Sequence, residues 1–405
     1  MAVSRRKVLS FAAALGLCGE AAAAEGPGSF PFRVTRNRPW TVAFFDRTKE
    51  PRAVLIDTGS NLFAINPKVA ASAGLRRVEK GQVQALIGRA DVPIYQANEV
   101  LIANTVRERD VYLAGVVLDG ADTVSGMIPA PMNGVTAFDF DALTVTMSGI
   151  HVPDLSGYAR LPYVATGSSA VSGSVDRMGE MSAQDDTRAV LDLRPTVEVE
   201  LDGRMVPFLV DTGCSDALVL SPEYVKANGL WEHHAGAVET KMRTLVDTVA
   251  VKVARADSLK IGPVRFLHPI ITIPDPNHGG SDAFSRYGGI VGMELLRRLN
   301  LVADPFARRL WVKPNAAIMD VYRYDRAGAD IDVVDGVLRV TWLAEGGPAA
   351  RAGLKLSDRV SGWAGPDSYH GLLWALKGAP GATVRIQVER DGGPQVIEIK
   401  LEELI

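Results

Sequence analysis

The feature that most constrains this chain of 405 residues is a three-residue sequence, Asp-Thr-Gly, that occurs twice at the end of an apolar segment. It occurs in "AVLIDTGSNLFAI", residues 53–65, and again in "PFLVDTGCSDALVL", residues 207–220. Asp57 and Asp211 are therefore 154 positions apart (211 minus 57). One such turn says little about function, because Asp and Gly are common turn residues. Two matching turns call for an explanation that covers the whole chain.

The sequences around the two turns are also similar, which indicates an internal duplication. Residues 38–60 and 194–214 each begin with Arg-Pro, continue through two strand-like segments and end in the Asp-Thr-Gly region. Downstream, residues 123–147 and 288–312 each contain Gly-Met, with an Asp 12 or 13 positions after the Gly. Three landmarks in the same order therefore predict two homologous β lobes.

The predicted fold is mainly β: two homologous lobes related by a pseudo-twofold axis, followed by a small α+β domain. The segment between the lobes is rich in Gly, Ser and charge, which favours a loop or flexible connection. The predicted divisions are an export signal (1–24), a first lobe (30–150), a connection (151–190), a second lobe (191–314) and a C-terminal domain (315–405).

The first 24 residues have the pattern of a cleaved export signal. Arg5, Arg6 and Lys7 precede an apolar stretch and a run of small residues. The arginine pair resembles the twin-arginine motif, and the general export route is the alternative. We therefore expect a periplasmic or secreted protein without a stable membrane anchor. Removal of this segment, which contains Cys18, leaves Cys214 as the sole cysteine and excludes an intrachain disulfide.

Composition and motifs argue against several other classes of function. The net charge is −3, with acidic and basic residues interspersed, so no basic footprint of a nucleic-acid-binding protein is present. The chain contains no phosphate-binding loop, dinucleotide fingerprint or Gly-x-Ser-x-Gly sequence. His233 and His234 are adjacent and point apart on any regular element, so we expect neither a metal site nor a cofactor.

Two matched carboxyl groups indicate acid–base chemistry. If the pseudo-twofold axis brings Asp57 and Asp211 together, both cannot ionise easily, and the pair would share one proton. One carboxylate then acts as general base on a water, and the other polarises a carbonyl group. Gly59 and Gly213 let each turn present a backbone N–H group to its carboxylate.

At this point the chain resembles the aspartic proteases, in particular their retropepsin-like branch, over residues 30–314. The resemblance rests on "DTGS" at 57–60, "DTGC" at 211–214 and an apolar-apolar-Gly element beneath each turn. It implies that Asp57 and Asp211 are catalytic, and that Thr58 and Thr212 grip each other across the lobe interface. The residues it assigns to the two turns are Thr58, Gly59, Ser60, Thr212, Gly213 and Cys214.

Two positions depart from the family pattern. Cys214 stands where the family usually has a hydroxyl that bonds the carboxylate, and a thiol is a weaker donor. The apolar-apolar-Gly element is complete as Ile290-Val291-Gly292 in the second half. In the first half we align it with Val124-Ser125-Gly126, where Ser125 breaks the apolar rule.

A substrate-covering flap is expected between the first Asp turn and the Gly-Met landmark. Residues 83–95, "VQALIGRADVPIY", have a glycine between two apolar strands. We predict Ile87 and Gly88 at the flap tip. The corresponding segment of the second half, residues 238–251, lacks a glycine, so we expect one functional flap.

The C-terminal domain resembles a PDZ domain of the kind attached to bacterial proteases. The resemblance rests on "GGPAARAGLKLSDRV", residues 346–360, in which Ser357 replaces a glycine of the family. It implies that the domain binds the C-terminal end of a peptide as an added strand. We predict Gly336, Val337 and Leu338 as the loop that captures the carboxylate, although Asp335 beside them is unfavourable for an anion.

Together these patterns predict an exported aspartic endopeptidase that acts on peptides or proteins and needs no metal or cofactor. The alternative is a degenerate protease fold that binds peptides without cutting them, which the departures at Ser125 and Cys214 favour. A variant in which the two aspartates come from two chains is unnecessary, because one chain carries both turns.

Overall fold

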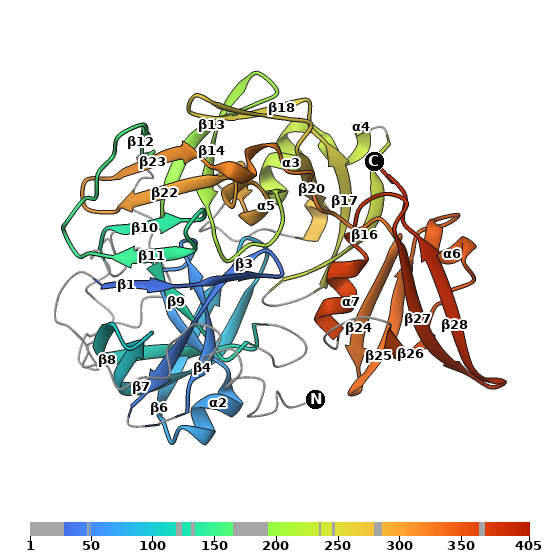
Figure 1. The fold of residues 1–405 in the computed structure, drawn as a ribbon, viewed down its shortest axis with the longest axis horizontal. Helices are drawn as coiled ribbons and strands as arrows, with labels where there is room; N and C mark the ends of the chain where they lie inside the picture. Colours follow the sequence, from blue (N-terminus) through green and yellow to red (C-terminus); the bar gives the residue numbers. More distant parts are fainter. Residues whose placement is uncertain are drawn as a thin grey trace.

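The structure is a computed structural model that describes residues 28–405 except 47, 49, 119–123, 131–133, 165–192, 235, 245–247, 279–285 and 364–368. The predicted export signal and most of the predicted connection lie outside the described residues. The fold is mainly β and bilobal, as predicted. Strands of the first half, those of the second half and a C-terminal module occupy three regions of the ribbon (Figure 1).

The first lobe is built on an eight-stranded sheet whose central strands are buried on both faces. Its strand β4 ends at Asp57, and the last four residues of β4 are buried, as expected for a strand covered on both sides. In sheet order the strands are β2 (Arg33–Thr35), β3 (Arg38–Phe45), β4 (Arg52–Asp57), β9 (Gly126–Pro129), β5 (Phe63–Ile65), β8 (Val106–Gly115), β7 (Arg89–Ile102) and β6 (Arg76–Gln84).

The second lobe repeats this strand order in a nine-stranded sheet. The order β3-β4-β9-β5-β8-β7 of the first lobe corresponds to β13-β14-β21-β15-β20-β17, with the same alternation of parallel and antiparallel neighbours. The strands in order are β16 (Val238–Arg243), β17 (Thr248–Arg255), β20 (Ile270–Pro274), β15 (Leu218–Leu220), β21 (Gly289–Val291), β14 (Arg204–Val210), β13 (Thr196–Leu201), β18 (Ser258–Ile261) and β19 (Val264–Leu267).

Equivalent helices in the two lobes begin in the same way. Helix α2 (Pro67–Ser72) is capped by the Asn66 side chain, and α3 (Pro222–Asn228) by the Ser221 side chain. In both, proline occupies the first turn, where its missing N–H group costs no hydrogen bond. The remaining short helices of the second lobe are α4 (Leu230–His233), η2 (Pro276–His278) and α5 (Met293–Leu296).

A third sheet joins the lobes. Strand β10 of the first half pairs with β22 of the second half, with Phe138 opposite Leu301. The order is β1 (Gly28–Pro31), β11 (Thr144–Met147), β10 (Thr136–Asp139), β22 (Leu299–Asp304), β23 (Arg309–Pro314) and β12 (Ala159–Pro162). Strand β12 lies within the range predicted as an inter-lobe connection, so part of that range is regular structure that pairs with β23. The two lobes therefore share a continuous sheet and one buried core.

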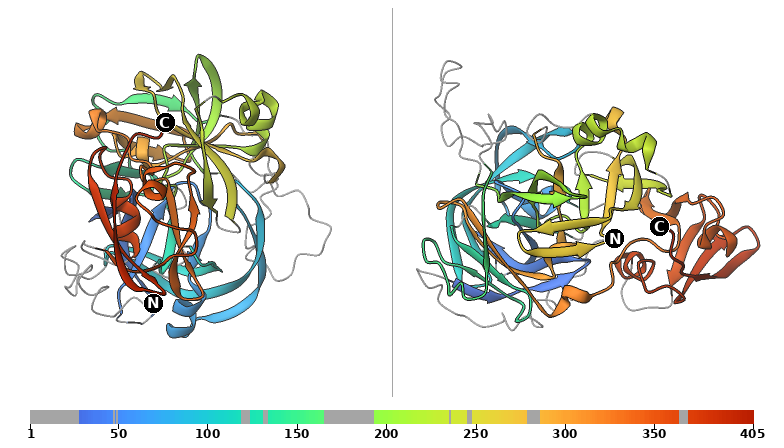
Figure 2. Two further views of the ribbon diagram at one scale, coloured as in Figure 1. Left: turned by 90° about the vertical axis from the view of Figure 1, so that its right-hand side faces the viewer. Right: turned by 90° about the horizontal axis from the view of Figure 1, so that it is seen from above.

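The C-terminal module has a five-stranded antiparallel sheet and its own core, which includes Ile331, Leu372 and Ile386. Burial alternates along β27, as in a sheet with one covered face. After the short helix η3 (Ala316–Met319), which precedes the module, its elements are β24 (Ala329–Val334), β25 (Val337–Leu343), α6 (Pro348–Arg351), β26 (Arg359–Trp363), α7 (Tyr369–Ala375), β27 (Thr383–Arg390) and β28 (Gly393–Lys400). Figure 1 and the right-hand view of Figure 2 show the module at one side of the lobes.

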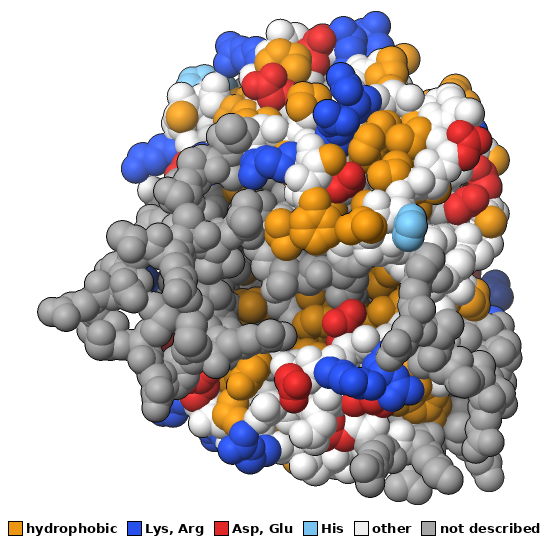
Figure 3. All heavy atoms as spheres, turned by 90° about the vertical axis from the view of Figure 1, so that its left-hand side faces the viewer, with side chains coloured by type: hydrophobic (Ala, Val, Ile, Leu, Met, Phe, Trp, Pro, Cys, Tyr) orange, Lys and Arg blue, Asp and Glu red, His pale blue; other side chains and the backbone are white. Residues whose placement is uncertain are grey.

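The opposite side of the molecule is shown in Figure 3, where acidic and basic side chains are interspersed around patches of hydrophobic ones. Within the described residues, no helix is both long and apolar enough to cross a membrane.

Candidate active site

Each aspartate lies where a buried strand meets a tight turn. The N–H group of Gly59 donates to Asp57 Oδ1 at 2.7 Å, and the N–H group of Gly213 donates to Asp211 Oδ1 at the same distance. Asp211 also accepts from the N–H group of Cys214 at 3.1 Å. The turns therefore hold the two carboxyl groups with backbone donors, and Asp211 has one more such donor.

The two turns interlock through their threonines. Thr58 Oγ1 donates to the carbonyl of Val210 at 2.7 Å, and Thr212 Oγ1 donates to the carbonyl of Ile56 at 2.7 Å. Each hydroxyl also accepts the N–H group of the opposite threonine at 3.0 Å. This reciprocal arrangement is the grip that the sequence resemblance implied, and it links strand β4 to strand β14 across the lobe interface.

The glycines bring the carboxyl groups together. A Cβ atom on Gly59 would lie 2.4 Å from Asp211 Cγ, and one on Gly213 would lie 2.6 Å from Asp57 Cγ. Each glycine therefore packs directly on the carboxyl group of the other lobe, and any side chain at either position would push the pair apart. The structure thus brings Asp57 and Asp211 face to face.

Burial and proximity change the protonation of the pair. Burial raises the pKa of Asp57 well above its ordinary value, and the neighbouring charge of Asp211 and a hydrogen bond with it raise it further. Burial also raises the pKa of Asp211, while hydrogen bonds from Asp57, Gly213 and Cys214 oppose this rise. The arrangement therefore favours a proton on Asp57 and the negative charge on Asp211.

The side chains that follow the two glycines bond to the turns and not to the carboxyl groups. Ser60 Oγ donates to the carbonyl of Leu62 and accepts its N–H group, both at 3.0 Å. Cys214 likewise accepts the N–H group of Asp216. Burial, and then the charges of Asp216 and Asp211, raise the pKa of the Cys214 thiol well above its ordinary value, so the thiol stays protonated and is a poor nucleophile.

The apolar-apolar-Gly element of the first lobe is not where the sequence alignment placed it. Beside β14, Val210 pairs with Val291, whereas beside β4 Ile56 pairs with Ile128. The counterpart of residues 290–292 is therefore 127–129, Met-Ile-Pro, and the prediction of residues 124–126 was wrong by three positions. Ser125 corresponds instead to Gly288, because their N–H groups bond to the equivalent carbonyls of Ala53 and Pro207.

The true departure in the first lobe is thus Pro129. In the second lobe the N–H group of Gly292 donates to the carbonyl of Ala217 at 2.9 Å. Proline has no N–H group, so the first lobe lacks this bond. Ser125 itself is buried and its backbone N–H and C=O are both bonded, so it does not disturb the turn.

The β6–β7 hairpin carries the predicted flap tip across the cleft. The tip turn is closed by the N–H group of Ala85, which donates to the carbonyl of Gly88 at 3.1 Å, and Gly88 has a φ of +83° that suits glycine. Leu86 and Ile87 are buried against second-lobe residues that include Val251. The second-lobe hairpin β16–β17 lies in the equivalent place, although its tip, residues 245–247, is outside the described residues.

A cleft of about 600 Å³ contains the aspartate pair and extends to the C-terminal module. Its walls include the flap tip, the β16–β17 hairpin, edge strand β24 and helix α7. Arg38 and Arg194, the arginines of the repeated Arg-Pro sequence, also line it. Arg38 opposes the raised pKa values of both aspartates. The sequence repeat marked these arginines, but we did not predict their place in the cleft.

The predicted capture loop of the C-terminal module is not a free loop. Asp335 and Gly336 form the two-residue turn between β24 and β25, with φ values of +51° and +76°. Val337 and Leu338 pair with Val334 and Val333 in the β24–β25 ladder. Residues 336–338 are therefore part of a hairpin turn and the start of β25, and their role in carboxylate capture stays a prediction.

His233 and His234 end helix α4, and His233 Nδ1 contacts the carbonyl of Gly229 at 2.7 Å. In the part of the chain that the structure describes, no group of three or more His, Cys, Asp or Glu side chains is arranged to hold a metal ion.

Comparison with known proteins bears on the two lobes. Residues 41–129 and 197–295 match a family model described as aspartyl protease. Each lobe matches this family. The two matched segments contain Asp57 and Asp211, respectively. The first ends with strand β9, which pairs with β4, and the second ends shortly after strand β21, which pairs with β14. Both matched segments lie within the two lobes, and the C-terminal module lies outside them.

A search of solved structures found the aspartic proteinase from Irpex lacteus, with 13% sequence identity and a TM-score of 0.41. The similarity covers 73% of this chain and 99% of that one. A search of curated protein sequences returned no match.

Proposed function

We propose that the protein is an aspartic endopeptidase in which Asp57 and Asp211 form the catalytic dyad. The observation that carries the proposal is the reciprocal packing of each turn glycine on the opposite carboxyl group, together with the interlocked threonines. This packing leaves two carboxyl groups of unequal protonation at the base of a cleft large enough for a peptide.

The unequal hydrogen bonding supports distinct roles for the two residues. Asp211, with two backbone donors, is the base that removes a proton from a water as its oxygen attacks the scissile carbonyl carbon. Asp57 donates its proton to the carbonyl oxygen, which gives a tetrahedral gem-diol. When the C–N bond breaks, Asp211 delivers its proton to the departing amine and Asp57 takes back a proton from the gem-diol. The site thereby returns to its starting state.

We further propose that the C-terminal module binds an extended segment of the substrate. Edge strand β24 offers backbone groups for an added strand, and the cleft that contains the dyad continues to β24 and α7. Export to the periplasm or the medium is supported by the N-terminal sequence alone.

The test is cleavage of a diverse peptide pool by the chain and by Asp57→Asn and Asp211→Asn variants. Each single variant should lose activity on the order of 10³-fold or more, and the double variant hardly more than either, because the two residues act as a unit. Asp110→Asn, which alters an exposed carboxylate, is the matched control. Folded wild-type protein that binds peptides from the pool but cuts none would favour the peptide-binding alternative.

A further inference from the structure

Glu294 is a buried carboxylate that the proposed mechanism does not use. It follows Gly292 by two positions, lies in helix α5, and only 1% of its surface is exposed. Its Oε1 accepts from Arg298 Nη2 at 3.0 Å and from Arg297 Nη2 at 3.3 Å. A buried carboxylate needs such partners, because an unpaired charge in the interior is strongly unfavourable.

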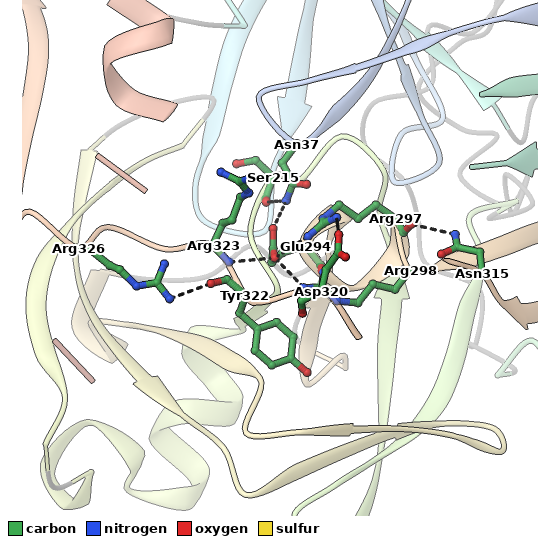
Figure 4. A network of polar contacts seen from close by, with 10 residues as sticks. All are labelled: Asn37, Ser215, Glu294, Arg297, Arg298, Asn315, Asp320, Tyr322, Arg323 and Arg326. Atoms are coloured by element: carbon green, nitrogen blue, oxygen red, sulfur yellow. Dashed lines mark hydrogen bonds and ion pairs between the residues drawn. The ribbon is translucent and has the colours of Figure 1, made fainter. Parts of the chain in front are cut away.

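Glu294 is also tied to the loop that carries Asp211, which we define as the Asp211 loop, residues 211–216. The backbone N–H group of Glu294 donates to the carbonyl of Asp216 at 3.2 Å. Its Oε2 accepts from Asn37 Nδ2 at 2.9 Å, and the same Nδ2 donates to the carbonyl of Ser215 at 2.6 Å. Figure 4 shows Asn37 and Ser215 on one side of Glu294. The Asp211 loop is therefore held between Asn37 of the first lobe and Glu294 of the second.

On its other side Glu294 meets the linker that leads to the C-terminal module, residues 320–326. The N–H group of Arg323 donates to Glu294 Oε1 at 3.0 Å. The guanidinium of Arg298 lies 4.7 Å from the Tyr322 ring centroid and donates to the carbonyl of Asp320 at 3.0 Å. Figure 4 shows this linker side of the network. One carboxylate thus joins the Asp211 loop to the linker.

The module itself reaches the same two places. The Arg323 guanidinium lies 4.7 Å from the ring centroid of Trp374 in α7. Lys377, just beyond α7, pairs with Asp216 of the Asp211 loop at 3.9 Å. The linker therefore contacts Glu294 through Arg323, and the module contacts both the linker and the Asp211 loop.

We propose that Glu294 is a positioning residue through which docking of the linker and the C-terminal module sets the geometry of the Asp211 loop. This inference rests on the proposed function, since it assigns a role in positioning Asp211. When the module is docked, it holds the Asp211 loop in the position required for catalysis. Displacement of the module breaks the contacts of Arg323 with Trp374 and of Lys377 with Asp216, and this frees the loop. The module then controls the chemistry in addition to binding substrate.

The test compares Glu294→Gln with the wild-type chain. Glutamine keeps the shape but loses the charge that holds the two arginines. For a short peptide kcat should fall by about 10²-fold with KM nearly unchanged, the size of effect expected from displacing a catalytic group by about 1 Å. Glu398→Gln, which breaks the exposed pair with Arg385, is the matched control and should keep wild-type kcat.

A second readout does not depend on peptidase activity. Cys214 lies in the Asp211 loop, and its half-buried thiol should react slowly with iodoacetamide in the wild-type chain, because its raised pKa keeps it protonated. In Glu294→Gln the alkylation rate, followed by mass spectrometry on the peptide that contains Cys214, should rise at least 10-fold. If wild-type protein cuts no peptide but the variant shows this rise, the proposed function fails and the positioning role stands.

Asn37→Gly provides a milder variant in case Glu294→Gln does not fold. Asn37 has a φ of +58°, which glycine adopts without strain, so the change removes only the amide that joins Glu294 to Ser215. Asn104→Gly, at φ +57° in the turn between β7 and β8, is its control. Unchanged kcat and unchanged Cys214 alkylation in a folded Asn37→Gly or Glu294→Gln variant would overturn the proposal.

Discussion

Asp57 and Asp211 occupy equivalent positions, yet their surroundings make them unequal. Asp211 accepts N–H groups from Gly213 and Cys214, whereas the Asp57 turn supplies the N–H group of Gly59. Each additional donor stabilises the ionised form of a carboxyl group. The two copies of the turn therefore differ in their hydrogen-bond donors, and this difference favours the proton on Asp57.

Replacing Asp57 with Asn should stabilise the protein at neutral pH. The unfolded chain loses the Asp57 proton near the ordinary pKa of 3.8, whereas the folded protein keeps it to a higher pH because its pKa is raised. The contribution of Asp57 to stability is therefore full below pH 3.8 and is lost as the pH rises through the folded pKa.

The melting temperature of Asp57→Asn should accordingly exceed that of the wild type by a margin that grows from pH 4 to pH 7. The corresponding difference in the free energy of unfolding, above the folded pKa, is about 1.4 kcal/mol for each pH unit between the unfolded and folded pKa values of Asp57. Asp110→Asn serves as an exposed control. A margin that does not change with pH would contradict the raised pKa of Asp57.

Contacts of Asn37 with Ser215 and Glu294 could not be predicted from the sequence. These residues are 178 and 257 positions apart, and no repeat or motif relates them. The Thr58–Thr212 grip could be anticipated only because the family resemblance supplied it. Polar side chains that act through three-dimensional proximity alone leave no trace in local sequence patterns.

At the scale of elements, strand register decides which residues of the two halves are equivalent. The sequence alignment matched two Gly-Met pairs, Gly126-Met127 and Gly292-Met293, but strand β9 is shifted so that Pro129 takes the place of Gly292. A three-residue error of this kind arises because short apolar strands look alike in sequence, whereas their hydrogen-bonded neighbours are unique. The lobes, their strands and both Asp turns were predictable because periodic patterns and turn residues mark them locally.

The flap hairpin allows a prediction at this scale. Replacing Ile87 with Ala removes buried apolar contact between the flap tip and the second lobe, and Ile-to-Ala changes in a packed site cost about 2–5 kcal/mol. Because the contact exists only when the flap is closed, kcat/KM for a peptide should fall by roughly 10-fold or more while the melting temperature changes little.

Val78→Ala, on strand β6 of the same hairpin but packed in a different cluster, is the control for this change. If both variants have the same kcat/KM as the wild type, the contact of the flap tip with the second lobe has no part in the reaction.

At the scale of the whole molecule, the boundary of the C-terminal module differs from what composition suggested. Residues 315–323 belong structurally with the lobes: Asn315 Nδ2 donates to the carbonyl of Arg297 at 2.9 Å, and Asp320 pairs with Arg297 at 2.7 Å. The module's own core begins only at Ala327. A change in sequence character marks where a new strand pattern starts. It does not reveal that the linker before that pattern packs on the second lobe.

Two truncated chains distinguish these boundaries. A chain that ends at Arg323 keeps every linker contact of Glu294, Arg297 and Arg298 described above, whereas one that ends at Pro314 loses them. The shorter chain should unfold at lower urea concentration, since each buried polar group left unpaired costs about 1–3 kcal/mol. Equal urea midpoints for the two chains would show that residues 315–323 contribute nothing to the lobes.

The sheet shared by the lobes has a consequence for how the chain folds. Thr136 of β10 pairs with Ala303 of β22, so this ladder closes a loop of 167 residues (303 minus 136). Until β22 has been synthesised, the edge of β10 is unpaired and open to other strands. Contacts of such long range make folding slow, because the entropy of closing the loop is lost before the ladder forms. The first lobe therefore cannot complete its pairing until the second lobe has been synthesised. Until then, the unpaired edge of β10 exposes the nascent chain to aggregation.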